Sequence, residues 1–224
     1  MIETEPRRRL SSRARRVREH CVLALVSAAL LAAMLLAVRS NDLRFRLSMA
    51  TAYASLALLV TSLVVGPLNV LRGRPNPVST NLRRDVGIWA GAIGVAHVVI
   101  GLQVHLRGRM IEYFIDPKRV GSALPLRVDR FGVANDTGLF AGLVLVLLLG
   151  LSNDISLRTL GTTRWKALQR WNYGAMAFTV IHGAVYELVE KRAPYFVAVF
   201  GIQVLVALAF QLAGYRVVRS GRAP

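Results

Sequence analysis

Apolar and polar residues follow one another along this chain in long blocks. Six apolar segments alternate with short, arginine-rich connectors, and they cover Cys21–Val38, Leu47–Leu71, Val86–Leu106, about Thr137–Ser152, about Trp171–Tyr186 and Ala193–Tyr215. A helix that spans a bilayer needs roughly 20 apolar residues. The fourth and fifth segments are shorter, although Arg170 and Glu187 can reach toward water and lengthen the fifth. The pattern predicts an all-α polytopic membrane protein with six transmembrane helices.

The positive residues indicate the orientation of these helices. If the N-terminus lies inside, the inner side carries 18 of the 29 Lys and Arg residues and the outer side carries 11. Because inner loops carry the excess of such residues, both termini are predicted to be cytoplasmic. We expect a basic segment over 1–20, a six-helix domain over 21–215 and a short tail over 216–224. Residues 72–77 and 153–168 would form inner loops, and 107–136 an outer loop.

Composition and charge narrow the class of protein further. Of the 224 residues, 54% are hydrophobic and 18% are charged, whereas about a quarter are charged in a soluble domain. The net charge of +17 flanks the apolar runs, so the lipid bilayer with its anionic head groups is the expected partner and nucleic acid is not. No glycine-rich nucleotide motif is present, and we expect no NAD(P)H or FAD domain within this chain.

Few side chains in the apolar segments can carry chemistry. The segments contain no Lys, Arg, Asp or Glu, and the only titratable groups well inside them are His97, His182 and tyrosines such as Tyr53 and Tyr173. Ion-coupled transporters usually bury carboxylates or bases along their path. The sequence therefore disfavours a transporter and directs attention to the two histidines.

Each of these histidines has distinctive neighbours on its own helix face. Gly94 and Gly101 lie at i−3 and i+4 from His97, where they leave a slot for a flat macrocycle or let two helices pack closely. Phe178 and Tyr186 flank His182 at i−4 and i+4. A packing histidine would bond to a hydroxyl or a backbone carbonyl. Two mid-membrane histidines without ionic partners favour instead the axial ligation of one haem iron, as in low-spin b-type cytochromes.

Other cationic side chains and histidines are interpreted as interfacial. His105 lies about 12 Å beyond His97 along a helix, too far to share one ion with it, and no residue nearby completes a zinc site. His20 precedes the first segment and is read in the same way. Four outer-loop arginines either pair with haem propionates or contact lipid head groups, and lipid is favoured for each: Arg107, Arg109, Arg127 and Arg130.

Two blocks of sequence resemble the ferric reductase-like transmembrane family. The first is RRDVGIWAGAIGVAH, which ends at His97. The second is SNDISLRTLGTTRWKALQRWNY, which starts at Ser152 and is followed by His182. Within the family, the subgroup most similar comprises the haem-binding membrane subunits of bacterial methionine sulfoxide reductase systems. Gln169 stands where the family has a second histidine on the fifth helix, so the resemblance implies one haem instead of two.

The resemblance implies a membrane b-type cytochrome of the bacterial inner (plasma) membrane. One haem b would be ligated through its iron by His97 and His182, with Gly94, Gly101, Phe178 and Tyr186 around it. As an oxidoreductase subunit it would pass electrons to a periplasmic or membrane redox partner protein, ferric iron or oxygen. The donor would be a quinol, a bound flavin or a separate reductase. The alternative is a haem-free membrane scaffold subunit that keeps the same fold and is no enzyme.

Overall fold

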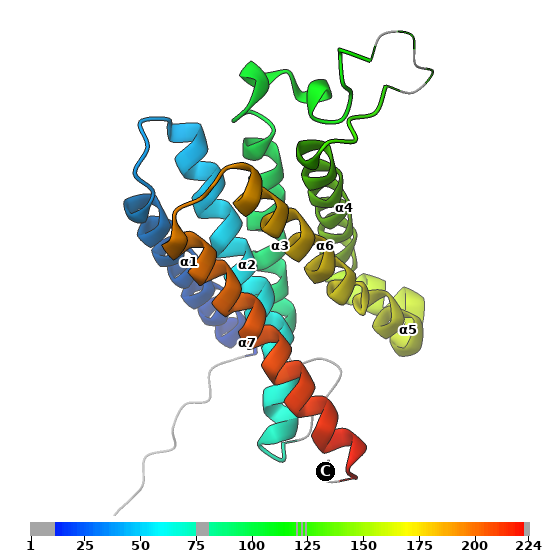
Figure 1. Ribbon diagram of the computed structural model, residues 1–224. Coiled ribbons are helices and arrows are strands. Elements are labelled where there is room, and N and C mark those ends of the chain that lie inside the picture. The colour runs from blue at the N-terminus through cyan, green and yellow to red at the C-terminus, as the bar shows by residue number, and fades with distance from the viewer. Residues whose placement is uncertain (1–11, 75–80, 120, 122, 124, 222–224) are drawn as a thin grey trace, which may run out of the picture.

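The computed structural model describes residues 12–74, 81–119, 121, 123 and 125–221 (Figure 1). These residues form seven α-helices and two short 3-10 helices, and their only β-pairing is one isolated bridge between Ile115 and Leu126. The elements are α1 (Ser12–Ala37), α2 (Leu43–Leu71), α3 (Asn81–Gly101), η1 (Leu106–Gly108), η2 (Met110–Tyr113), α4 (Arg130–Leu151), α5 (Asp154–Gln169), α6 (Trp171–Val189) and α7 (Pro194–Arg219). The prediction of an all-α fold is confirmed.

Five of these helices are long and apolar enough to cross a membrane, namely α1, α2, α3, α4 and α7. The sixth predicted segment of this kind corresponds to α6, which has 19 residues. Its apolar character is diluted by Asn172, His182 and Glu187. Residues 1–11 and 75–80, which include parts of the predicted basic segment and of the predicted inner loop at 72–77, lie outside the described residues.

Several boundaries differ from the sequence prediction. Residues 153–168, predicted as a loop, form helix α5, which begins where the Asn153 side chain accepts a hydrogen bond from the Ser156 amide at 2.7 Å. Hydropathy did not indicate this helix because its residues are mostly polar. Helix α3 ends at Gly101 instead of Leu106, and its last carbonyl accepts a hydrogen bond from the hydroxyl of Tyr113 at 3.1 Å. Residues 130–136, predicted in the outer loop, belong to α4.

Helix α2 lies at the centre of the bundle and contacts α1, α3, α6 and α7 (Figure 1). Helix α4 packs against α3 and α6. The α3–α4 contact is close, because a Cβ at Gly91 would meet Leu149 Cγ at 2.8 Å and a Cβ at Gly142 would meet Val98 Cγ2 at 3.0 Å. These contacts bring α3 and α6 to the two sides of one space, with α2 and α4 as its other walls.

At the end of the bundle where α3 begins, ion pairs between side chains join neighbouring helices. The Arg84 guanidinium lies 2.6 Å from an Asp154 carboxylate oxygen, and Arg16 lies 3.8 Å from the other oxygen. The hydrogen bond and the charge of Arg84 lower the pKa of the Asp154 carboxyl. This cluster links α1, α3 and the start of α5.

Candidate functional site

A cavity lies between α2, α3, α4 and α6. The space in it that the centre of a water molecule can reach is about 150 Å³. Apolar side chains such as Leu56 and Leu145 line one part of it. At the end near the α3–α4 and α6–α7 connections, called the polar end below, the walls carry ionisable groups including His105, Glu190 and Arg192. The cavity is therefore amphipathic, and it would suit a ligand that has one apolar and one polar side.

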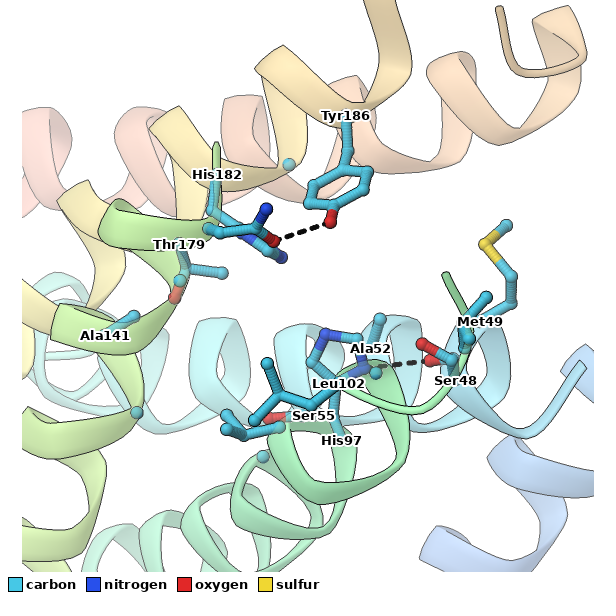
Figure 2. A pocket seen from close by; sticks show the side chains of 18 of the residues that line it. Ser48, Met49, Ala52, Ser55, His97, Leu102, Ala141, Thr179, His182 and Tyr186 are labelled. Atoms are coloured by element: carbon cyan, nitrogen blue, oxygen red, sulfur yellow. Dashed lines mark hydrogen bonds between the residues drawn. The ribbon is translucent and has the colours of Figure 1, made fainter. Parts of the chain in front are cut away.

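His97 of α3 and His182 of α6 lie on opposite walls of this cavity and face each other across it (Figure 2). Their ring centres are 6.0 Å apart and their planes are inclined by 74°. His97 Nδ1 lies 3.0 Å from the Ser48 carbonyl oxygen, and His182 Nδ1 lies 2.7 Å from the Ala134 carbonyl oxygen. The sequence prediction that pairs these histidines across one space agrees with their placement.

The two carbonyl contacts determine where the imidazole protons lie. A carbonyl oxygen only accepts hydrogen bonds, so each Nδ1 carries the hydrogen and donates it. In a neutral ring the other nitrogen, Nε2, then holds a free lone pair. Such a bond at Nδ1 is the usual device that fixes the tautomer of a metal-binding histidine. His97 and His182 are thus both prepared to act as ligands through Nε2.

The separation of the rings suits one metal ion between them. An imidazole nitrogen binds a metal at about 2 Å, so two such nitrogens on opposite sides lie about 4 Å apart and their ring centres about 6 Å apart. The observed 6.0 Å matches this value. Among the described residues, no group of three or more His, Cys, Asp or Glu side chains could hold a metal ion. The two histidines would therefore supply only two ligands.

The glycines around the histidines have different roles. Gly94 and Gly101 both line the cavity, as expected. A Cβ at Gly94 would meet Leu145 Cδ1 at 2.7 Å, so this glycine is needed for helix packing, whereas a Cβ at Gly101 would make only ordinary contacts. Gly138 of α4 was not singled out from the sequence, yet a Cβ there would lie 2.5 Å from His182 Nδ1. The face of α4 that meets His182 is visible only in the tertiary structure.

Of the two aromatic residues predicted around His182, only Tyr186 contacts its ring within the cavity. The Tyr186 ring centre lies 4.9 Å from that of His182, and its hydroxyl donates to Asn135 Oδ1 at 2.7 Å. Phe178 does not line the cavity and stacks instead on Phe140 of α4, with ring centres 5.7 Å apart. Helix geometry placed both aromatic residues on one side of His182, but the neighbouring α4 separates their surroundings.

An ion cluster closes the polar end of the cavity. His105 Nε2 lies 2.7 Å from Glu190 Oε1, and Arg192 lies 3.0 Å from Glu190 Oε2. Burial raises the pKa of the Glu190 carboxyl, but the hydrogen bond from His105 and the charge of Arg192 together lower it below the ordinary value. His105, interpreted from the sequence as a plain interfacial histidine, is therefore part of the cavity wall.

A second carboxylate also borders the cavity. The Tyr53 hydroxyl donates to Glu187 Oε1 at 2.6 Å, which joins α2 to the last turn of α6. The apolar segments given above contain no carboxylate; Glu187 lies one residue beyond the fifth of them, and Glu190 lies further along the chain. At the opposite end of the bundle, Asp85 is fully buried, and its Oδ1 lies 3.6 Å from Nε2 of His20.

Two of the four arginines considered as partners of haem propionates pair with carboxylates of the protein. Arg109 pairs with Glu112 at 3.1 Å, and Arg127 pairs with Asp129 at 3.2 Å. None of the four outer-loop arginines, Arg107, Arg109, Arg127 and Arg130, lines the cavity, whereas Arg192 does. Gln169 ends α5 away from the cavity, and its buried Nε2 has no hydrogen-bond partner among the described residues.

The geometry defines an all-helical protein with long apolar helices and a buried, facing pair of histidines. No protein-family model matches this sequence, and no curated protein matches it significantly. The family resemblance described above therefore rests on the residues quoted for it. The function has to be argued from the site itself.

Proposed function

We propose that this chain is a six-helix membrane cytochrome of the b type, in which His97 and His182 ligate the iron of one haem. The observation that carries the proposal is the pair of imidazole rings 6.0 Å apart across one cavity, each with its Nδ1 against a backbone carbonyl, which leaves Nε2 available as a ligand. Two unprotonated nitrogens on opposite walls of one cavity suit an electron-pair acceptor between them. A packing role would account for the carbonyl contacts at Nδ1, but it would not account for the pairing of the two rings across one cavity.

Haem is favoured over a bare metal ion by the number of ligands. The two histidines provide two nitrogens, and the described residues contribute no third His, Cys, Asp or Glu ligand. A zinc ion needs about four ligands, whereas a porphyrin brings four nitrogens of its own and leaves two axial positions for the protein. When bound, the haem supplies a one-electron iron couple whose potential its surroundings adjust.

The chain's own residues hold and shield this position. The carbonyls of Ser48 and Ala134 keep both Nδ1 atoms protonated and both rings in place. Gly138 allows α4 to approach the His182 ring closely. Apolar side chains of α2 and α4, such as Leu56 and Leu145, exclude water from the deeper part of the cavity.

The membrane topology follows from the same proposal. Helix α6 would be the sixth span, since His182 lies within it, and the inner end would be the one that carries the excess of Lys and Arg. Both termini are then cytoplasmic, in the inner membrane of a bacterium, and the polar end of the cavity faces the outer side. Electrons would pass to a periplasmic or membrane redox partner, ferric iron or oxygen, from a quinol, a flavin or a separate reductase.

The test is the optical spectrum of the full chain, purified in mild detergent from cells supplied with haem. We expect a Soret band and about one haem per chain, both lost in His97→Ala and in His182→Ala. His20→Ala is the matched control, because His20 lies outside this cavity, and it should retain the haem. A folded chain without a Soret band, or a band unchanged in both ligand variants, would contradict the proposal and support the haem-free scaffold.

A further inference from the structure

The ion cluster at the polar end is connected to the histidine pair through one aromatic ring. Tyr186 lies between His182 and His105, with ring centres 4.9 Å from the first and 6.2 Å from the second. The Tyr186 and His105 rings are nearly parallel, at 19°. His105 and His182 are therefore at most about 11 Å apart. A unit change of charge at that distance in a partly buried site shifts a proton equilibrium.

His105 is the group in this cluster that can take up a proton when the charge at the histidine pair changes. Its side chain is 33% exposed and so exchanges protons with water, while Glu190 is 14% exposed. Arginine does not titrate near neutral pH, tyrosine cannot gain a proton there, and histidine changes its charge between about pH 5 and pH 8. Apart from His97 and His182, the titratable or charged groups that line the cavity with it come from three elements and the residues after α6: Tyr53 of α2, Tyr113 of η2, Tyr186 and Glu187 of α6, and Glu190 and Arg192 beyond α6.

We propose that reduction of the histidine-ligated site is coupled to the uptake of one proton by His105, which rests on the proposed function. The oxidised site takes one electron from a one-electron donor, and His105 takes one proton from water on the outer side. Nε2 of His105 lies 2.7 Å from Glu190 Oε1, so in the neutral ring we assign the hydrogen to Nε2 and the new proton to Nδ1. The resulting imidazolium pairs with the Glu190 carboxylate and offsets the added negative charge.

The test is a spectroelectrochemical titration of the haem-loaded protein between about pH 5 and pH 8. We expect the midpoint potential of the wild type to fall with rising pH, by at most about 59 mV per tenfold change in proton concentration. In His105→Gln this dependence should largely disappear. His20→Gln, which changes a histidine outside the cavity, should keep the wild-type dependence.

A second variant covers the case in which His105→Gln does not fold. Glu190→Gln removes the carboxylate that would pair with the imidazolium, so the dependence of the potential on pH should be weaker than in the wild type. A Soret band together with a potential that is independent of pH in the wild type, or equally dependent in His105→Gln, would overturn this inference alone. The absence of a Soret band in all forms would overturn the proposed function and this inference with it.

Discussion

The substitution Gly138→Ala tests whether α4 positions the His182 ring. The added Cβ would lie 2.5 Å from Nδ1, where contacts between 3.4 and 4 Å are ordinary. The ring must therefore withdraw by about 0.9 Å. The same nitrogen donates to the Ala134 carbonyl at 2.7 Å, and a withdrawal of this size stretches that bond beyond hydrogen-bonding range.

Gly138→Ala has two opposing effects on the free energy of unfolding. Leaving a buried donor and acceptor unpaired costs about 1–3 kcal/mol. Replacing glycine by alanine inside a helix returns about 1 kcal/mol. Gly150→Ala is the matched control, since it also lies in α4 and its Cβ would meet nothing within 4 Å. The free energy of unfolding should be about 1–3 kcal/mol lower in Gly138→Ala than in Gly150→Ala.

The assay combines thermal unfolding in detergent with the optical spectrum of the haem-loaded protein. Because a metal–nitrogen bond tolerates deviations of only about 0.2 Å, the displaced ring should also weaken or alter the Soret band in Gly138→Ala and leave it unchanged in Gly150→Ala. If the two variants unfold at the same temperature and give the same spectrum, the positioning role of Gly138 is wrong.

Three further changes have expected outcomes. Tyr53→Phe deprives Glu187 of its 2.6 Å donor and should lower the free energy of unfolding in detergent by about 1–3 kcal/mol; unchanged stability would argue against this link. Because Arg84 lowers the pKa of Asp154, stability from this pair is complete above about pH 3.9 and is lost as the pH falls through the lowered value. Asp154→Asn should remove that part of the acid unfolding profile, and an identical profile would refute it. Gln169→His should leave the haem content, measured as the pyridine complex, at one per chain, and two haems would contradict this.

Hydropathy alone predicts most of the helices and fails where tertiary contacts set a boundary. The end of α3 at Gly101 depends on the hydroxyl of Tyr113, which is twelve residues away in the chain. Helix α5 has only one buried side chain, Trp165, whose Nε1 donates to the Leu151 carbonyl at 2.9 Å. A polar helix of this kind leaves no apolar block in the sequence, so it is read as a loop.

In the site, too, the residues that stand out locally in the sequence could be predicted, and the contacts between distant segments could not. His97 and His182 stand out in the sequence because an ionisable side chain inside an apolar segment is costly and is rarely kept without a function. The carbonyls that orient them belong to other helices and are invisible in the sequence. Glu190 and Arg192 follow the apolar part of α6, where a charged pair is expected at any membrane surface, so their contact with His105 could not be predicted.

The packing of the rest of the bundle explains why one site is expected instead of two. Toward the end of the bundle opposite the polar end, α2, α3 and α6 are joined by a cluster of buried side chains, which includes Leu59, Leu63, Val86, Ala90 and Met176. Asn172 there lies 3.4 Å from the Ser62 hydroxyl. Under the proposed function, an electron would therefore reach the histidine pair without a second metal centre stacked beneath it. Under the same proposal, entry from the polar end or from the lipid-facing sides would place the donor within the membrane or on its outer side, and the proton taken up by His105 would enter from that outer side as well.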